Sequence, residues 1–589
     1  MSRKIRDLLP ELGPTELTKL RSCLDDEGPI VTWFYGPTGA GKSAQIAAFA
    51  EESRDQGAAV LTVDCRTVEP TVAGLLSTLS ELLEEPFTDL EKAADAISLL
   101  AGRAIVVFEN YEVFRLADSW LRRDFIPALD ATARVILVSR ESPAAGWVSA
   151  SEWQAFFQAI SLNAASPTDP AEITKLYLDE VPDTELREAL DAASVVRRVT
   201  KPMLASLVPE ANTDEMYQRQ SALSFVETRR DGLAIAESVG RLIAEQLQAA
   251  DVERYRGYQK SAWRLLRQQL RESSRADLWR CTADVIYLIE NPVIREAFFP
   301  SESAQFSVEP AVGGDMQAVL DITAMHEPQA EVEIMRHWSQ HLPSAFHVLR
   351  DSSGLIAGYS CIALPSDLDG DWMQSDPVAR NWQAHVNRKG RAARPESLFL
   401  RRWLSREHGE APSPVQAAAW VDVKRTYLEL RPELRRVYLT LQDLGPYAPV
   451  AVQLGFEVMG DLEAQIGGEP YHSAMLDFGP GSVDGWICDL LAAELGVADD
   501  QRLDSAAREL ITDTGRVPLT PLEFKLVAML ESRQGEAVSR EELLREVWGH
   551  GYDGGSNVVD ALVRGLRKKC AESADMFETV RGVGYRLRA

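Results

Sequence analysis

The sequence lacks the features that direct a protein into or across a membrane. No apolar run approaches the length that spans a bilayer, and the basic residues 1–7 are followed by neither an apolar segment nor a small-residue cleavage site. The six cysteines are scattered and none forms a CxxC pair, which is typical of free thiols in a reducing compartment. We therefore predict a cytoplasmic protein with no membrane partner.

Metal-binding residues are also sparse. Among eight histidines, only His337 and His341 have the i, i+4 spacing that places two zinc ligands on one helix face. The residues between them lack the glutamate of the zinc-protease motif, and no cysteine or carboxylate stands at an obvious third-ligand spacing. The pair gives little support for a metal site.

Positive charge is in deficit, with 62 Lys and Arg against 89 Asp and Glu and a net charge of −27. Such a charge opposes nucleic-acid binding, because phosphates must be neutralised by cations. The deficit is uneven, since residues 515–589 carry 12 Lys and Arg against 11 Asp and Glu. DNA contact is therefore compatible with the C-terminal end, while the acidic bulk suppresses non-specific binding.

A phosphate-binding loop follows the first apolar strand, at residues 30–35. The loop has the GxxxxGK[ST] spacing and precedes a helical run; its residues are Gly36, Pro37, Thr38, Gly39, Ala40, Gly41, Lys42 and Ser43. Its backbone N–H groups converge on phosphates at a helix N-terminus, Lys42 adds a point charge, and the Ser43 hydroxyl ligates Mg²⁺. The predicted cofactors are ATP or ADP with Mg²⁺.

Two further apolar strands end in polar residues that suit nucleotide chemistry. The strand at residues 104–108 ends in Glu109, our candidate for the catalytic residue and for holding the Mg²⁺-bound water. The strand at residues 134–138 ends in Ser139 and Arg140. Arg140 is either a sensor of the γ-phosphate or a solvated residue at a strand end.

The glycine loop, the strand AVLTVD, the strand IVVFENYE and the strand VILVSR together resemble a STAND NTPase, a signal-transducing P-loop class. The resemblance covers residues 1–165 and continues more faintly to about residue 300. It implies a nucleotide-controlled switch with slow hydrolysis, in which a lid and a winged-helix segment close over the ATP site. Glu109 departs from the family, which more often has LLVLDN there.

Residues 170–290 are predicted to be helical, most clearly at 222–247 and 253–270. In the second helix, basic residues recur every three or four positions and form one face, at Arg256, Lys260, Arg264, Arg267 and Arg271. This face is either simply solvated or a contact for DNA or another subunit.

Residues 306–478 change to an α+β pattern, with a hairpin at 345–363, a helix at 415–430, a strand at 436–440 and the closing LGFEVMG. These features resemble the GNAT acetyltransferase fold. In that family a Q/R-x-x-G-x-G/A turn binds the pyrophosphate of acyl-CoA, and residues 406–411 fit the pattern. Glu407, Glu410, Pro412 and Pro414 oppose phosphate binding there. We prefer a degenerate sensory or scaffolding domain, so acetyl-CoA binding is not our main expectation.

The alternative is a DNA-tethered, ATP-regulated acetyltransferase. In that case Tyr438 or Tyr447 would serve as general acid, although such tyrosines are more often part of a core.

The C-terminal segment predicts three helices and a hairpin. Thr520-Pro-Leu-Glu523 is a capping box, residues 539–542 repeat the capping pattern, a third helix follows Ser556, and residues 577–587 alternate around a glycine turn. The sequences LTPLEFKLVAML, VSREELLREVWG, SNVVDALVRGLRKK and ETVRGVGYRL resemble the OmpR/PhoB-type DNA-binding domain.

That resemblance implies a third helix in the major groove and Arg581 in the minor groove of double-stranded DNA. The candidate DNA contacts are Ser556, Asn557, Arg564, Arg567, Lys568, Arg581 and Tyr585. Leu562 and Gly565 depart from the family, and nothing resembles a phospho-acceptor receiver domain. A winged helix used only for protein contacts is the alternative.

The predicted fold class is multidomain α/β and α+β. It comprises a P-loop NTPase domain (1–165), a helical lid and winged-helix region (166–304), a GNAT-like domain (305–480), a linker (481–502) and a winged-helix domain (503–589). The predicted function is an ATP-regulated bacterial transcription regulator, at most a slow ATPase, that forms a homo-oligomer and contacts RNA polymerase at promoters.

Overall fold

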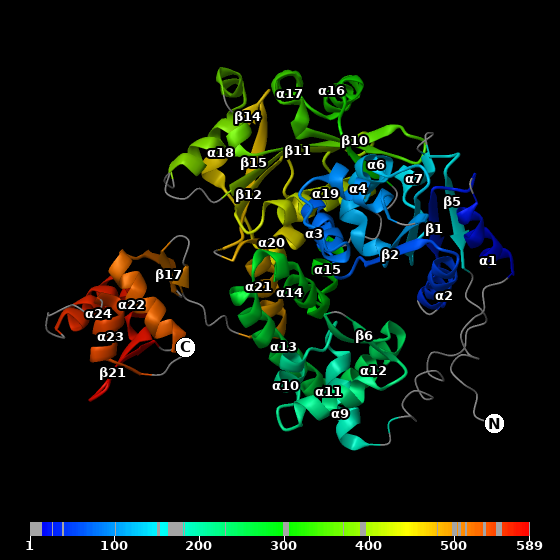
Figure 1. Ribbon diagram of the computed structural model, residues 1–589. Coiled ribbons are helices and arrows are strands. Elements are labelled where there is room, and N and C mark those ends of the chain that lie inside the picture. The colour runs from blue at the N-terminus through cyan, green and yellow to red at the C-terminus, as the bar shows by residue number, and fades with distance from the viewer. Residues whose placement is uncertain are drawn as a thin grey trace. The chain divides into compact units, whose positions relative to one another are not determined.

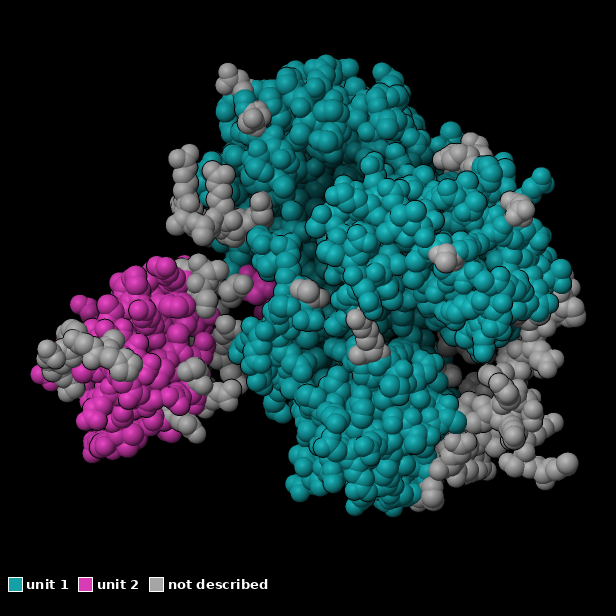
Figure 2. Space-filling view, in the orientation of Figure 1, with its two compact units in different colours: residues 1–477 teal, residues 478–589 magenta. Residues whose placement is uncertain are grey.

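The computed structural model describes residues 14–587 apart from 26, 38–39, 101, 150–152, 163–180, 182, 230, 299–305, 369, 389–395, 480, 498–502, 505–507, 513–514, 534–536 and 549–556. The chain divides into two compact units, residues 1–477 and 478–589 (Figure 2). No helix in the described part is both long and apolar enough to cross a bilayer.

The first unit contains a five-stranded parallel sheet in the order β2-β3-β4-β1-β5. Its strands β1, β2 and β5 are labelled in Figure 1. The strands are β1 (Val31–Tyr35), β2 (Ala59–Asp64), β3 (Ala104–Glu109), β4 (Arg134–Ser139) and β5 (Phe157–Ser161). Four of the five were predicted from their apolar runs; β5 is short and less apolar. Alternate residues face opposite cores, so that Trp33 packs in one cluster and Phe34 in the other.

Helices cover both faces of this sheet. One face packs against α2 (Lys42–Asp55), whose Ile46 and Phe49 join the cluster around Phe34. The other packs against α3 (Val72–Leu82) and α4 (Leu90–Ser98), through side chains that include Leu75 and Ile97. A short α1 (Pro14–Arg21) precedes β1, and α7 (Ala145–Ser149) follows β4. Between β3 and β4, an irregular segment contains η3 (Tyr111–Ala117), α5 (Asp118–Trp120), η4 (Leu121–Phe125) and α6 (Ile126–Ala128).

The next region contains α9 (Thr184–Ser194), α10 (Lys201–Leu207), α11 (Thr213–Ser221), a hairpin of β6 (Val226–Arg229) and β7 (Gly232–Ile235), and the helices α12 (Glu237–Ala250), α13 (Val252–Glu272), α14 (Arg275–Leu288) and α15 (Pro292–Phe298). The prediction of one helix at 222–247 is therefore wrong in its first half. Gly232 has φ of +139°, and a Cβ there would lie 2.7 Å from the carbonyl oxygen of Val199, so this position turns the chain into a hairpin.

Residues 306–477 form a mixed sheet in the order β13-β15-β12-β11-β10-β9-β8, with β14 paired to β15. Its strands are β8 (Ser307–Pro310), β9 (Phe346–Arg350), β10 (Ile356–Ala363), β11 (Glu396–Ser405), β12 (Leu434–Leu441), β13 (Phe456–Val458), β14 (Ala464–Ile466) and β15 (Glu469–Asp477). Its helices are α16 (Met316–His326), α17 (Gln329–His341), α18 (Pro377–Arg388), α19 (Pro414–Leu430) and α20 (Ala448–Leu454). The parallel pairing of β11 and β12 stops at Leu400 and Leu439, although both strands continue.

The second unit begins with α21 (Ser482–Leu495), which occupies most of the predicted linker. The linker prediction did not include this helix, in which Trp486, Ile487, Leu490 and Leu491 recur at helical spacing and are buried. The rest of the unit is a small sheet of β16 (Leu503–Asp504), β17 (Glu509–Thr512) and β18 (Gly515–Pro518), then α22 (Pro521–Ser532), α23 (Arg540–Trp548), α24 (Asn557–Cys570), and a second sheet of β19 (Val538–Ser539), β20 (Phe577–Val580) and β21 (Gly584–Leu587).

Candidate nucleotide and DNA sites

The predicted P-loop joins β1 to α2. Gly41, with φ of +79°, directly precedes α2, and a Cβ at Gly36 would lie 2.7 Å from the carbonyl oxygen of Leu162. The ammonium group of Lys42 folds back onto the loop and donates to the carbonyl oxygens of Gly36 (2.7 Å) and Pro37 (2.9 Å). Ser43 is exposed on the first turn of α2. Thr38 and Gly39 lie outside the described residues.

The sheet order decides which strand ends border the loop. Because β4 lies between β1 and β3, the carboxyl end of β4 is next to the P-loop, and the N–H of Gly36 donates to the carbonyl oxygen of Ser139 (3.2 Å). Glu109, at the end of β3, is therefore one strand further away than the sequence suggested. Arg140, directly after β4, is the nearer of the two predicted residues in strand order.

Glu109 lies beside Asp64, its partner in the register of β2 and β3. Burial raises the pKa of Glu109, and the neighbouring charge of Asp64 adds to this effect. Asp64 itself is fixed by Arg66, which donates from two nitrogens (3.0 and 2.9 Å), and by the side-chain amide of Asn110 (2.9 Å). Although Asp64 is also buried, the bonds from Arg66 hold its pKa below the usual value.

Arg140 is held by two carboxylates. Its Nε donates to Glu112 (2.7 Å), its backbone N–H donates to the same carboxylate (3.1 Å), and a terminal nitrogen donates to Glu237 (2.8 Å). Glu112 belongs to η3, whereas Glu237 is the first residue of α12. The predicted γ-phosphate sensor therefore joins the five-stranded sheet to the helical region.

Lys42 shares this electrostatic environment. Burial lowers its pKa and Arg140 lowers it further, while Glu112 and Glu237 oppose the shift. Glu112 was not chosen from the sequence, although it stands only three residues beyond Glu109. The signal that could have identified it was the second carboxylate in the ENYE segment.

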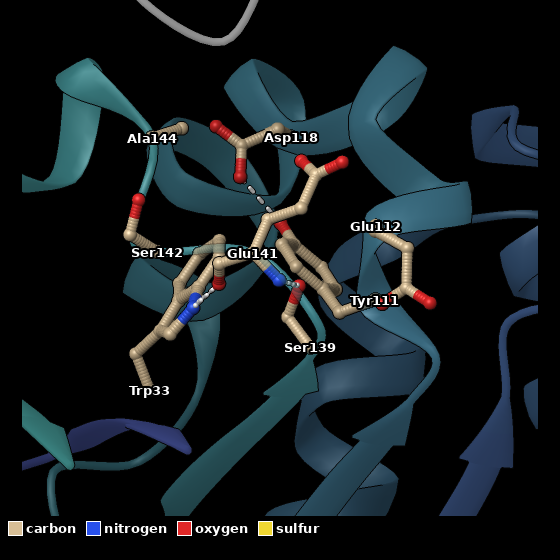
Figure 3. Close-up of a pocket in the computed structure, with 8 residues that line it drawn as sticks. All are labelled: Trp33, Tyr111, Glu112, Asp118, Ser139, Glu141, Ser142 and Ala144. Carbon is tan, nitrogen blue, oxygen red and sulfur yellow. Dashed lines mark hydrogen bonds between the residues drawn. The ribbon is translucent and has the colours of Figure 1, made fainter. Parts of the chain in front are cut away.

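Figure 3 shows how the segment that carries Glu112 is anchored beside the end of β4. The hydroxyl of Tyr111 donates to Asp118 (2.6 Å), as Figure 3 shows. Trp147 donates to the same oxygen (2.7 Å). The indole N–H of Trp33, on β1, donates to the carbonyl oxygen of Glu141 (2.9 Å). These buried bonds fix η3 and the loop after β4, so that Glu112 and Arg140 keep their positions.

The residues present fit a nucleoside triphosphate with Mg²⁺. A helix N-terminus, a lysine bonded only to loop carbonyls in the described contacts, and an exposed Ser43 supply the donors that phosphates and Mg²⁺ require. An arginine and several carboxylates are gathered at the same edge of the sheet.

The GNAT-like turn has little left to offer a pyrophosphate. The N–H groups of Arg406, His408, Gly409 and Ala411 already donate to Ala357, Ser405, Ser405 and His408, respectively. The Glu410 carboxylate accepts from the N–H groups of Gln442 (3.0 Å) and Asp443 (2.7 Å), directly beyond β12, and from the buried Arg402. An internal carboxylate thus bridges the segments after β11 and β12.

The two tyrosines considered as general acids are also engaged. The hydroxyl of Tyr438 is bonded to His385 (2.9 Å), and that of Tyr447 donates to the carbonyl oxygen of Glu410. Burial raises the pKa of Tyr438 to about 12.

His341, one of the two histidines at i, i+4 spacing, stacks on Trp372 at 5.2 Å between ring centroids. Within the described residues, no three potential ligands are grouped to hold a metal.

In the second unit, α24 separates a buried face from an exposed stripe. Its residues Val559, Val563, Leu566 and Cys570 are buried in the core with α22 and the hairpin. On the opposite side, an exposed stripe recurs at i, i+4, i+7 and i+11, comprising Asn557, Ala561, Arg564 and Lys568. Three of the predicted DNA contacts therefore share one solvent-facing surface.

Two other predicted contacts are part of the domain's own packing. Arg567 donates to the carbonyl oxygen of Phe577 (3.0 Å) and to the hydroxyl of Thr579 (2.8 Å), and it lies over the Tyr585 ring. Tyr585 is 5% exposed, and its hydroxyl donates to Asp560 (2.5 Å). Both residues hold the hairpin against α24, and their role as DNA contacts stays a prediction.

Arg581 is exposed at the tip of the hairpin, beside Gly582 with φ of +79°. Thr520 and Glu523 form the predicted capping box at the start of α22. Ser556 lies outside the described residues.

On α13, the predicted basic face is present, with Arg256, Arg264 and Arg271 exposed, while Arg267 lies over the ring of Trp263.

Residues 514–587 match the family described as "Transcriptional regulatory protein, C terminal". Transcriptional regulatory protein AfsQ1 of Streptomyces coelicolor is 44% identical over 88 residues, which make up 14% of this chain and 39% of that protein. TrcR of Mycobacterium tuberculosis is 39% identical over 90 residues, which make up 15% of this chain and 35% of TrcR. The chain thus spans roughly two fifths of the length of the curated relatives it matches. The predicted winged helix of the response-regulator type is confirmed.

Among solved structures, the DNA-binding domain of Bacillus subtilis CssR is 42% identical and covers 15% of this chain and 98% of that chain, with a TM-score of 0.14. The STAND protein PH0952 of Pyrococcus horikoshii is 13% identical over 56% of each chain (TM-score 0.26). A GNAT-family acetyltransferase of Listeria monocytogenes is 13% identical over 29% of this chain and 94% of that chain (TM-score 0.20). The STAND and GNAT-family structures have TM-scores below 0.5 and share 13% identity with this chain, so they establish neither ancestry nor activity. The nucleotide and GNAT-like assignments therefore depend on the residues described above.

Proposed function

We propose that this chain is a transcription regulator that binds promoter DNA through its C-terminal winged helix and is controlled by ATP or ADP with Mg²⁺ at the P-loop. The observation that carries the proposal is the exposed stripe of α24, which presents Asn557, Arg564 and Lys568 opposite the buried face. The family match at residues 514–587 supports the same role.

The stripe suits the major groove of double-stranded DNA. Asn557 and Arg564 carry side chains that read base edges or bind phosphates, and Lys568 adds a phosphate contact one turn later. Arg581 projects from the hairpin tip, where a basic side chain suits the minor groove. Arg567 and Tyr585 act indirectly, because they position the hairpin that carries Arg581.

The nucleotide site would control how the helical region, α9 to α15, packs against the five-stranded sheet that carries the P-loop, which we call the nucleotide sheet. Lys42 and Ser43 would hold the phosphates and Mg²⁺, together with a carboxylate from the segment 109–112. Arg140 would exchange Glu112 and Glu237 for the γ-phosphate, which would release α12 from the nucleotide sheet. Hydrolysis, with Glu109 or Glu112 as the candidate base, would restore the contact. We expect this change to govern assembly of a homo-oligomer, which then contacts RNA polymerase.

We assign the GNAT-like domain a sensory or scaffolding role. The internally bonded turn and the Glu410 carboxylate support this role over acyl transfer, because four of the six N–H groups of residues 406–411 already have partners and Glu410 adds negative charge.

The test is to select genomic fragments that bind the full-length protein, with and without ATP and Mg²⁺, and to repeat the selection with Lys42→Ala. We expect Lys42→Ala to abolish nucleotide binding and the nucleotide dependence of DNA binding. Lys92→Ala, an exposed lysine on α4, is the matched control and should change neither. A Lys42→Ala variant that binds nucleotide and regulates DNA binding normally would contradict the proposal.

A further inference from the structure

An open pocket lies at the edge of the nucleotide sheet opposite to the P-loop. Its volume is about 520 Å³, which is within the range of small-molecule sites. Ile30 directly precedes β1 and Phe156 directly precedes β5, so the pocket lies at the amino-terminal ends of these parallel strands. The P-loop follows the carboxyl end of β1, about 17 Å away along the strand. The two sites are therefore distinct.

Most of the pocket wall is apolar. Ile126 and Trp153 are buried, Ile30 and Leu129 are half-buried, and Phe156 is 47% exposed. An exposed aromatic ring beside a hollow offers a flat surface for an apolar body. The wall alone would accept many apolar molecules and gives no specificity.

Two arginines supply that specificity. Arg122 and Arg123 both line the pocket, and both belong to η4 (Leu121–Phe125), a π-helical turn of the kind that occurs frequently at functional sites. Arg122 is 2% exposed and donates to Glu309 (2.6 Å), yet its Nε is buried and has no hydrogen-bond partner among the described residues. Because this Nε has no exposed surface, a ligand in the pocket would reach Arg123 instead, which is exposed.

Glu309 is shared among three of the surrounding cations. Three guanidinium groups, of Arg122, Arg123 and Arg350, face two carboxylates, of Glu309 and Asp315. The other carboxylate at the pocket, Asp130, is already bonded to the N–H (2.8 Å) and the hydroxyl (2.6 Å) of Thr132. These bonds lower the pKa of Asp130, so it stays ionised and the charges around the pocket are balanced. Arg123, whose contact with the shared Glu309 is 3.7 Å long, is the cation that an anionic ligand would engage.

We propose that this pocket binds a small monoanion with an aromatic or aliphatic body. Its charged group would face Arg123, and its body would lie against Trp153 and Phe156. Glu309, the partner of Arg122 and Arg123, belongs to β8 of the GNAT-like domain, so a bound anion competes for the contact that joins this domain to the nucleotide sheet. The role of the pocket as a signal input depends on the function proposed above; the binding itself does not.

The probe for the test is 8-anilinonaphthalene-1-sulfonate, an aromatic monoanion whose fluorescence reports binding to the full-length protein. We expect one saturable site, which Arg123→Gln weakens roughly tenfold because it removes a charged hydrogen-bond donor. Arg264→Gln, the same change at an exposed position of α13, is the matched control and should leave the affinity unchanged. The uncharged analogue N-phenyl-1-naphthylamine should bind more weakly and should not respond to Arg123→Gln.

The proposal is overturned if the wild type shows no saturable site, if Arg123→Gln leaves the affinity unchanged, or if Arg264→Gln weakens binding equally. Near-ultraviolet circular dichroism of each variant verifies that the fold is intact. ATP titrations separate this proposal from the nucleotide switch. Lys42→Ala should keep the probe site, and Arg123→Gln should keep ATP binding, so either proposal can fail while the other stands.

Discussion

Arg564 and Arg567 are three residues apart on α24, yet the structure gives them opposite roles. Arg567 is half-buried, donates to Phe577 and Thr579, and lies over the ring of Tyr585. Hydrogen bonds from a charged group contribute about 1.5–3 kcal/mol, and partial exposure favours the lower end of that range. Arg567→Ala should therefore destabilise the winged helix by about 2 kcal/mol, which lowers its Tm by roughly 8–15 °C.

Arg564 is exposed and belongs to the stripe opposite the core. Arg564→Ala should change the free energy of unfolding by less than about 0.5 kcal/mol, as is usual for surface substitutions. Its effect falls on DNA instead, where losing a base or phosphate contact costs about 1–3 kcal/mol, or roughly 5- to 150-fold in Kd.

Both variants are measured by circular-dichroism melting of residues 478–589 and by fluorescence anisotropy of the full-length protein with a selected duplex at one fixed salt concentration. DNA titrations are run well below the melting transition, so that the folded fraction does not enter the comparison. If Arg567→Ala melted like the wild type while losing as much DNA affinity as Arg564→Ala, the division of roles would be refuted.

Two further predictions concern the first unit. Glu237→Gln removes one of the two carboxylates that hold Arg140; because the pair is half exposed, it contributes only about 0.5 kcal/mol, and ATP affinity measured by calorimetry should rise about twofold. An unchanged or lower affinity would contradict the proposed exchange. Burial raises the pKa of Glu331 to about 7, against the opposing charge of Arg401. Since the folded state then holds this proton more tightly than the unfolded state, stability to urea should fall as pH rises from about 4.5 to 7. Glu331→Gln should remove that slope, and an identical slope in the variant would contradict the reasoning.

Much of the fold could be predicted because local signals agreed with the tertiary structure. The apolar strands that end at Tyr35, Glu109 and Ser139 are buried on both faces of a parallel sheet, so their sequences are almost continuously hydrophobic. The capping box at Thr520 and the alternation in residues 577–587 likewise marked the winged helix.

Other features depended on tertiary contacts that no local pattern reveals. The hairpin at residues 226–235 replaces part of a predicted helix, and it pairs through Leu233 with Val199, which is distant in the sequence. Strand order is not encoded locally either. Glu109 was therefore expected beside the P-loop, whereas β4 lies between β3, which ends in Glu109, and β1, which precedes the P-loop. In the same way, the periodicity of α24 did not show that Arg567 turns toward Phe577 instead of toward solvent.

The most direct test of the account is the Kd of the full-length protein for a selected duplex, measured with ATP and Mg²⁺, with ADP and Mg²⁺, and without nucleotide. Coupling between two sites typically changes affinity by at least about fivefold. We therefore predict a difference of this size between ATP and ADP in the wild type and none in Lys42→Ala. Equal Kd values in all three conditions for the wild type would contradict the claim that nucleotide binding controls how the winged helix docks on DNA.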